Sequence, residues 1–331
     1  MNILITSASR KVSLVKYFQG ALKQEGGGKV ITVDTGPLCA ALFQSDLSYL
    51  IPRDSEPSFM PTILKLCKKY EIKLLIPTRD EELKIFAKNK EKFEEVGTKV
   101  MVAKPEVIEI CSDKLKFTRF CERNDIPVPK TYTKKEINES LLGFPLFIKE
   151  RYGKGSRNTF KIKNKKELEF FLGYVKNPIV QEYIKGKEYT IDLFADFDGR
   201  IISVVPRERI YLFGGESLIS RIDKNEKLIK AASGLAKKIG LVGHNNIQCF
   251  SDGNEVKFIE INPRYGGASS LSFAAGANTP LYLIQLVKGK KVKSKIGKFK
   301  DGLITVRYFK DIFINNDEVK KLEKFGQGYN F

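Results

Sequence analysis

Residues 244–264 read His-Asn-Asn-Ile-Gln-Cys-Phe-Ser-Asp-Gly-Asn-Glu-Val-Lys-Phe-Ile-Glu-Ile-Asn-Pro-Arg, and this stretch predicts a β-hairpin. Two runs rich in β-branched and aromatic residues flank a Ser-Asp-Gly-Asn turn, which is typical of two closely joined strands. Side chains alternate between the faces of a strand, so Glu260 and Asn262 share one face. If the turn centres near Gly253, Gln248 lies opposite Phe258 and diagonal to Glu260, on that same face.

Three oxygen donors, those of Gln248, Glu260 and Asn262, therefore converge above the hairpin. Hard oxygen ligands with few charges suit a Mg²⁺ ion that is shared with nucleotide phosphates. Arg264 follows as a fixed cation where an anionic substrate or a transferring phosphoryl group could lie. The alternative is a solvated hairpin face with a single acid, but the Pro-Arg-Tyr-Gly-Gly that follows Asn262 favours the functional interpretation. His244, the only histidine, is expected to be structural.

The composition is that of an ordinary globular protein. Of 331 residues, 42% are hydrophobic and 29% charged, which allows two or three domains with a large core. No apolar run reaches the ~20 residues that span a bilayer, and the first residues carry no charged signal segment, so we expect a cytoplasmic protein without membrane contacts. Five cysteines without a Cys-x-x-Cys pair indicate buried, reduced thiols.

The formal net charge of +19 raises the question of a nucleic-acid partner. The lysines are spread along the whole chain, however, and many lie near glutamates at helical spacing. We therefore expect no nucleic acid to bind. The charge favours the attraction of ATP and of anionic substrates.

The first hundred residues alternate short apolar runs with helical patterns, which predicts a parallel, doubly wound sheet. Ligands bind beyond the carboxyl ends of the strands in such sheets, and we take Arg10, Asp34, Arg79 and Asp80 as candidate substrate residues there. The first loop lacks Gly-x-Gly-x-x-Gly, which argues against dinucleotide binding. Serines 7 and 9 could cap a helix instead of holding an anion, and Asp34 could form a turn. Strands are predicted at 3–6, 29–33, 47–51, 73–76 and 100–103, and helices at 12–23, 60–70, 81–89 and 91–96.

The Ile-Pro-Val-Pro sequence at 126–129 breaks the chain before a mixed α+β unit. A helix is expected to begin at Pro105, and residues 112–114 are expected to cap the next one. Further on, strands are predicted at 144–149, 159–162, 179–183, 189–195, 201–206 and 303–308, and helices at 165–172, 228–239, 280–288 and 317–324.

A lysine and a glycine loop in this unit indicate a phosphate site. Lys149 ends a buried strand just before Tyr-Gly-Lys-Gly-Ser-Arg, residues 152–157. Gly153 and Gly155 allow the loop, with Ser156, to fold over phosphates with its backbone amides facing them, although such a loop is also an ordinary hairpin turn. Lys114 is a second candidate phosphate ligand.

Residues 181–190, Gln-Glu-Tyr-Ile-Lys-Gly-Lys-Glu-Tyr-Thr, suit the edge of an adenine ring, which needs one donor and one acceptor between apolar walls. Glu182 and Glu188 could hold the ribose hydroxyls or approach the metal. Exposed carboxylates at strand ends are the alternative for both.

Taken in order, Phe-Pro-Leu-Phe-Ile-Lys, the glycine loop, residues 181–190 and Ile-Glu-Ile-Asn-Pro-Arg resemble the motifs of the ATP-grasp superfamily. The chain looks most similar to the synthetase domains of the carbamoyl phosphate synthetase large subunit and to stand-alone carboxylate–amine ligases such as the pyrrolysine-pathway ligase. The resemblance covers residues 1–290. It implies a fold of the α/β and α+β classes, in which a Rossmann-like domain (1–110) precedes a two-lobed ATP-grasp domain (111–289). The lobes would be a small mobile one (125–185) and a large one with the metal site (186–289), and residues 290–331 would form a C-terminal extension.

The resemblance also assigns roles to residues. It implies that Lys114 and Lys149 contact ATP phosphates and that Tyr183 and Ile184, with Glu182, contact the adenine. Glu188 would meet the ribose or the metal. Gln248, Glu260 and Asn262 would bind Mg²⁺, which Mn²⁺ could replace, and Arg264 would face the reacting acyl phosphate. Arg207, Arg209 and Glu216 match the substrate region, which is less regular in the family.

The function expected from these features is ATP-dependent ligation of a carboxylate to an amine, or to ammonia or a thiol, through an acyl phosphate. Catalysis would rest on Arg264 and Lys149, and the partners would be small molecules. Dimers are common in the family, so a homodimer is compatible with the resemblance. One synthetase half without an amidotransferase does not suit full carbamoyl phosphate synthesis. The alternatives are a carbamate or carboxylate kinase and a non-catalytic nucleotide-binding regulatory protein.

Overall fold

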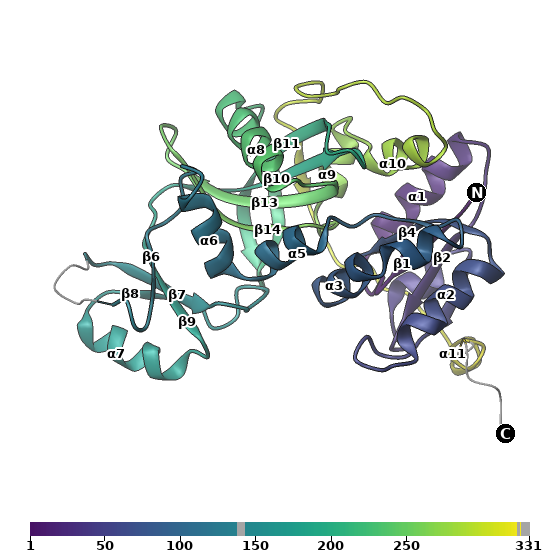
Figure 1. The fold of residues 1–331 in the computed structure, drawn as a ribbon, viewed down its shortest axis with the longest axis horizontal. Helices are drawn as coiled ribbons and strands as arrows, with labels where there is room; N and C mark the ends of the chain where they lie inside the picture. Colours follow the sequence, from purple (N-terminus) through teal and green to yellow (C-terminus); the bar gives the residue numbers. More distant parts are fainter. Residues whose placement is uncertain (138–142, 323–324, 326–331) are drawn as a thin grey trace.

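The computed structural model describes residues 1–137, 143–322 and 325, and these form three β-sheets with helices around them (Figure 1). One sheet is parallel, and the other two are antiparallel between all their neighbouring strands. The predicted combination of α/β and α+β architecture is thus confirmed. In the described part of the chain, no helix is both long and apolar enough to span a bilayer.

The N-terminal sheet is parallel and has the strand order β3-β2-β1-β4-β5. The order reverses between β1 and β4, so the loops after these two strands flank the crevice where ligands bind in open α/β sheets. Both strands are almost wholly buried. The elements are β1 (Asn2–Thr6), α1 (Val12–Gln24), β2 (Val30–Asp34), the 3₁₀ helix η1 (Ala40–Gln44), β3 (Leu47–Leu50), α2 (Phe59–Lys69), β4 (Ile72–Pro77), α3 (Asp80–Lys88), α4 (Lys90–Glu94) and β5 (Lys99–Val100).

A four-stranded sheet with the order β6-β9-β7-β8 forms a separate small layer, at the left of Figure 1. Its own apolar core includes Ile148, Leu168 and Val180, and α7 covers it. β6 was not predicted, since three residues carry too short a pattern to be recognised. The elements are β6 (Thr131–Thr133), β7 (Leu146–Glu150), β8 (Phe160–Ile162), α7 (Lys165–Tyr174) and β9 (Pro178–Glu182).

The third sheet has six strands in the order β14-β13-β10-β11-β12-β15. β11 extends seven residues beyond the predicted end at Pro206, and β12 was not predicted as a strand. The large core shared with the N-terminal sheet lies partly under α8. The elements are α5 (Pro105–Ser112), α6 (Lys114–Glu122), β10 (Lys187–Ala195), β11 (Ile201–Phe213), β12 (Glu216–Ile222), α8 (Glu226–Ile239), β13 (Gly243–Ser251), β14 (Val256–Asn262), α9 (Ser270–Ala274), α10 (Thr279–Val287), β15 (Ile304–Val306) and α11 (Asn316–Lys320).

The register of the β13–β14 hairpin differs from the prediction. Gln248 pairs directly with Glu260, and Cys249 pairs with Phe258, because the register shifts between Gln248 and Cys249. An extra residue on one strand makes such an irregularity, and its position cannot be read from alternation alone. The expected pairing of Gln248 with Phe258 is therefore wrong. The correction brings the amide and the carboxylate closer than the diagonal arrangement would.

The segment after residue 290 runs from the six-stranded sheet to the N-terminal parallel sheet (Figure 1). β15 pairs with β12 at the edge of the six-stranded sheet. Further on, Phe325 packs on Tyr49 and Tyr70 of the N-terminal sheet region. The predicted helix at 317–324 is observed as α11, which begins one residue earlier and ends at Lys320; residues 323 and 324 lie outside the described residues.

Candidate active site

One face of four adjacent strands carries the polar groups of the site. Gln248 pairs with Glu260 and Asn246 with Asn262 between β13 and β14. On the other side of β13, Thr190 pairs with Gln248 in β10. Alternation along the strands then brings further polar residues to this face, Glu188 and Asp192 of β10 and Arg207 and Arg209 of β11. The pairing of the four strands thus places these polar side chains side by side on one face of the sheet.

The three predicted metal ligands lie together on this face. The Asn262 amide donates to Glu260 Oε1 at 3.2 Å, and Gln248 Oε1 accepts from Arg209 Nη1 at 3.1 Å. Glu260 lies 3.6 Å from the ammonium of Lys114. Among the residues that the structure describes, no group of three or more His, Cys, Asp and Glu could hold a metal ion. A site here would thus use one or two carboxylates and neutral amides.

The residues present fit a divalent cation. Glu188 is largely desolvated, and its pKa is raised first by burial and further by the nearby charge of Glu260, against the opposing effect of Arg209. Two carboxylates in one partly buried site repel each other, and a bound dication relieves that repulsion. Oxygen donors and adjacent phosphates are the surroundings in which Mg²⁺ is usually held.

Two lysines approach this face from other elements. Lys149, on β7 of the small sheet, is only 5% exposed. Burial lowers its pKa to about 8, with Lys114 adding to the shift and Glu260 opposing it. Lys114 opens α6, because Asp113 caps this helix by accepting from the backbone of Leu115 at 3.0 Å. The ammonium of Lys114 also donates to the carbonyl of Gly153.

The glycine loop lies against the β11–β12 turn. A Cβ on Gly215 would come within 2.6 Å of the Gly155 backbone, so only glycine allows this close approach. Gly155 itself has φ +62° and Ser156 has φ +54°. A Cβ on Gly153 would meet the Glu150 side chain at 2.8 Å. The loop is thus held in a specific backbone conformation at the end of β7.

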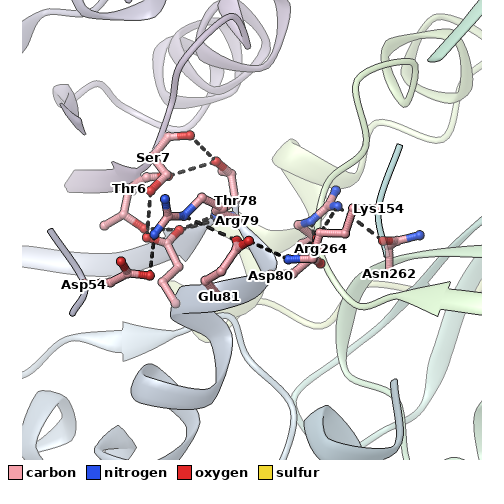
Figure 2. Close-up of polar contacts among 11 residues, drawn as sticks. Thr6, Ser7, Asp54, Thr78, Arg79, Asp80, Glu81, Lys154, Asn262 and Arg264 are labelled. Atoms are coloured by element: carbon pink, nitrogen blue, oxygen red, sulfur yellow. Dashed lines mark hydrogen bonds and ion pairs between the residues drawn. The ribbon is translucent and has the colours of Figure 1, made fainter. Parts of the chain in front are cut away.

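Arg264 and the glycine loop both contact the start of α3, as Figure 2 shows. Arg264 binds Asp80 through two hydrogen bonds, Nε to Oδ1 at 2.8 Å and Nη2 to Oδ2 at 2.6 Å. Its Nη2 also donates to Asn262 Oδ1 at 3.2 Å. Lys154 lies 2.7 Å from Glu81 Oε1 and 3.6 Å from Asp80 Oδ2. The N-terminal sheet therefore supplies the carboxylate that orients Arg264.

The predicted adenine segment follows β9. The Glu182 carboxylate accepts from Lys257 Nζ at 2.7 Å and from the Lys130 backbone at 3.0 Å. Tyr183 lies under the ammonium of Lys161, 4.0 Å from the ring centroid. Tyr183 and Ile184 are half-buried. The carboxylate of Glu182 is thus engaged in joining the small sheet to β14.

The loops of the N-terminal sheet are held mainly by internal bonds. Asp34 accepts from the backbone of Ser9 at 2.9 Å and of Thr35 at 2.8 Å, as a turn-forming aspartate does. Arg79 pairs with Asp54 (Figure 2). No side-chain hydrogen bond caps α1, so the capping role considered for the serines is not observed. Of this group, Asp80 alone contacts Arg264 directly.

Arg207 lies in a buried network rather than facing an open site. It is 2% exposed and donates to Asp192 through Nε at 2.8 Å and to Asn246 Oδ1 at 3.2 Å. Asp192 also accepts from Ser272 at 2.5 Å. Burial raises the pKa of Asp192, but the interactions with Arg207 and His244 together more than offset burial and hold the pKa below its usual range. Arg207 thus belongs to a buried part of the polar face, and the expectation that it contacts substrate does not suit this burial.

His244 and Asn246 belong to the same network. The ring of His244 lies between Thr279 and Ser269, at 3.1 and 3.0 Å, and stacks on Tyr265 at a centroid distance of 4.3 Å. The Asn246 amide donates to the carbonyl of Arg264 at 2.8 Å. Asn246 was missed in the sequence, although its two-residue spacing from Gln248 placed it on the same face. His244 has the structural role that was expected.

We expect Asp192→Asn to lower the free energy of unfolding by about 3–5 kcal/mol, because it leaves the buried Arg207 without its counter-charge. Asp198→Asn, an exposed residue in the turn after β10, is the control and should change stability by less than about 0.5 kcal/mol. Urea unfolding of both variants measures the difference. Equal stabilities would show that the buried pair does not support the fold.

Two family models match the chain. The model described as the PylC-like N-terminal domain matches residues 3–101, and the one described as ATP-grasp in the biosynthetic pathway with Ter operon matches residues 175–312. Together with the fold, these matches show that both segments of the chain are similar to ATP-grasp proteins, as the motifs indicated. They support the expectation of an enzyme of the ATP-grasp ligase class.

The curated relatives include carbamoyl phosphate synthase large chains. That of Clostridium acetobutylicum is 26% identical over 217 residues, which are 60% of this chain and 20% of the relative. That of Pyrococcus furiosus is 26% identical over 199 residues, 53% of this chain and 19% of the relative. The chain thus spans about a fifth of the length of the relatives it matches, so the reaction and the substrates are matters for proposal.

The similar solved structures share the fold. A biotin carboxylase–β-γ-ATP complex from Campylobacter jejuni has a TM-score of 0.73 at 20% identity, covering 92% of this chain and 74% of that one. An L-amino acid ligase from Bacillus licheniformis has a TM-score of 0.71 at 15% identity, covering 91% and 77%. The biotin carboxylase domain of the Hydrogenobacter thermophilus 2-oxoglutarate carboxylase, a dimer with bound MgADP and bicarbonate, has a TM-score of 0.73 at 17% identity, covering 92% and 73%.

Proposed function

We propose that this protein ligates a carboxylic acid to an amine at the expense of ATP, through an acyl phosphate. The observation that carries the proposal is the setting of Glu260 on the polar face. Lys114 lies 3.6 Å from its carboxylate, Asn262 donates to it at 3.2 Å, and Arg264 donates to Asn262 at 3.2 Å. The charge of Glu260 also acts on the buried Lys149. Cations beside oxygen donors suit the phosphates of a nucleotide with its bound metal ion. Mg²⁺, or Mn²⁺ in its place, would be held by Gln248, Glu260 and Asn262 and would neutralise phosphate charge when bound.

In the first step, a carboxylate oxygen of the substrate attacks the γ-phosphorus of ATP. An oxygen–phosphorus bond forms, the bond between the γ-phosphorus and the bridging oxygen breaks, and ADP leaves. The amine then attacks the acyl carbon, phosphate leaves with the electron pair of the broken bond, and the amine loses its proton to solvent. Phosphoryl transfer depends on positioning and charge neutralisation, which fixed cations supply.

The chain's own residues divide this work. Lys149 and Lys114 would bind phosphate oxygens, with the amides of Gly153, Gly155 and Ser156 over them. Arg264, held by Asp80, would face the acyl phosphate. Glu188 would contact the ribose or the metal, Arg209 would lie in the substrate region, and Tyr183 and Ile184 would lie beside the adenine. Closure of the small sheet over the site would exclude the water that hydrolyses an acyl phosphate.

We also propose the domain division given by the motifs, with residues 1–110, 111–289 and 290–331 as its units. The four-stranded sheet lies within the proposed small lobe, residues 125–185, and the metal-type hairpin within the large one. A homodimer and a cytoplasmic location remain predictions.

A panel of carboxylic acids and amines with ADP release as the readout tests the reaction. We expect ADP release that depends on one acid and rises or yields a coupled product when an amine is added. Rapid release of an acyl phosphate without any amine requirement would indicate a carboxylate kinase instead. ATP binding without turnover across a broad panel would favour a regulatory protein.

The buried Lys149 predicts a pH dependence of nucleotide binding. With a pKa of about 8, its charged fraction falls from about nine-tenths at pH 7 to about one-tenth at pH 9, so we expect the affinity for MgATP to fall about tenfold. Lys149→Arg keeps its charge over this range and should flatten the dependence. Calorimetry at pH 7, 8 and 9 measures both proteins, and parallel pH profiles would contradict the assignment.

The same shift has the opposite effect on folding. An unfolded lysine stays charged up to its ordinary pKa of 10.5, whereas the folded one loses its proton near pH 8. The unfolded state therefore binds more protons between these values, and the contribution of Lys149 to stability rises with pH across that window.

A further inference from the structure

The C-terminal strand brings an arginine to the edge of the candidate site. β15 pairs with β12, and the backbone of Arg307 continues that pairing by donating to Leu218 at 2.9 Å. The Arg307 guanidinium then donates through Nη1 to Glu216 Oε2 at 2.9 Å and to the Ser217 carbonyl at 3.3 Å. The C-terminal segment thereby contacts Glu216, which the resemblance assigns to the substrate region.

A second arginine meets Glu216 from the other side. Arg10, in the loop after β1, donates through Nη2 to Glu216 Oε1 at 2.9 Å. Among the described residues this is the one side chain that the Arg10 guanidinium contacts, and Arg10 is 77% exposed. A single carboxylate thus lies between two guanidinium groups, which leaves donors of Arg10 free and a net positive charge.

This group of charges adjoins the loop that follows Arg264. A Cβ on Gly267 would lie 3.4 Å from Glu216 Oε2 and 3.7 Å from Arg307 Nη2, so the missing side chain leaves this approach open. Lys11, next to Arg10, is half-buried, and among the described residues its ammonium has no hydrogen-bond or ion-pair partner. Its pKa is lowered first by burial and then by the charge of Arg264.

We propose that Arg10 and Arg307 bind a second anionic group of the substrate, separate from the carboxylate that is phosphorylated. This rests on the proposed function, in which the reacting carboxylate lies at Arg264. Glu216 would fix the two guanidinium groups in place, and Lys11 would lie between the two anion positions. The substrate class is then an acid with two anionic groups, and Arg307 is a specificity-determining residue supplied by the C-terminal segment.

Direct binding without ATP tests this inference, with linear dicarboxylates from malonate to pimelate and the monocarboxylates of equal chain length as probes. We expect the protein to bind at least one dicarboxylate tenfold or more tightly than its monocarboxylate partner, and Arg307→Gln to abolish this preference. Arg221→Gln on β12, whose partner is Glu208, is the matched control and should keep it. Thermal unfolding of each variant confirms that it is folded.

A gain-of-binding variant separates recognition from a structural role. Glu216→Gln keeps an accepting oxygen for one of the two guanidinium groups, releases the other, and removes the competing charge, so dicarboxylates should bind about three- to tenfold more tightly. The inference is overturned if the unmodified protein shows no dicarboxylate preference, if Arg307→Gln retains it, or if Glu216→Gln weakens binding. These measurements contain no nucleotide, so a failure of the ligase reaction, read from ADP release, is distinguishable from a failure here.

Discussion

Glu260→Ala should lower ADP release by a factor of at least about a thousand, a loss of about 4 kcal/mol of transition-state stabilisation. Glu260 is the carboxylate of the predicted metal trio, and it is directly paired with Gln248 and bonded to Asn262. Its removal takes away the charge that balances Lys114 and Lys149 and the charged ligand of the proposed cation. Steady-state turnover with saturating MgATP and the acid found in the panel measures the effect.

Two further variants make this result interpretable. Glu260→Gln keeps the size of the side chain and should lose nearly as much activity, because the charge is what matters. Glu255→Ala, at an exposed position just before the same strand, is the control and should retain full turnover. The assignment fails if Glu260→Gln retains more than about a tenth of the turnover while Glu255→Ala behaves as the unmodified protein does.

The second large effect is expected at Arg264. Arg264→Lys keeps a positive charge but cannot form the two parallel hydrogen bonds with Asp80, so its position over the acyl phosphate is lost. We expect kcat to fall by about 10²–10³, while the KM for ATP changes by less than about threefold, because Arg264 would act on the transferring group.

Asp80→Asn distinguishes positioning from charge at the same place. The arginine stays but loses the carboxylate that orients it, so we expect a smaller reduction in kcat, by about tenfold. Single-turnover measurements of the phosphoryl-transfer step compare the two variants. A larger fall in kcat for Asp80→Asn than for Arg264→Lys would contradict the proposal that Arg264 contacts the substrate and that Asp80 only orients Arg264.

Much of the site was predictable because it depends on short-range pattern. Glu260, Asn262 and Arg264 follow one another on a strand and its end, so alternation places the first two on one face. Lys149 was predicted because it ends an apolar run just before two glycines. In each case the relevant geometry is set by residues within a few positions along the chain.

What was not predictable depends on pairing between distant segments. The bulge beside Cys249 changes which residue faces Gln248, although the alternation of the sequence is the same in either register. Arg207 is buried because Asp192 on the neighbouring strand neutralises its charge. From the sequence alone, an arginine is expected to be exposed. Arg307 reaches Glu216 because β15 pairs with β12, across more than 80 residues.

The most direct test of the central claim is a crystal structure of the protein with Mg²⁺ and a non-hydrolysable ATP analogue. The account predicts a metal ion bound by side-chain oxygens of Gln248, Glu260 and Asn262 and shared with the phosphates, with Lys149 and Lys114 on phosphate oxygens. A nucleotide bound elsewhere, or bound on this face without any contact from Glu260 to metal or phosphate, would contradict it.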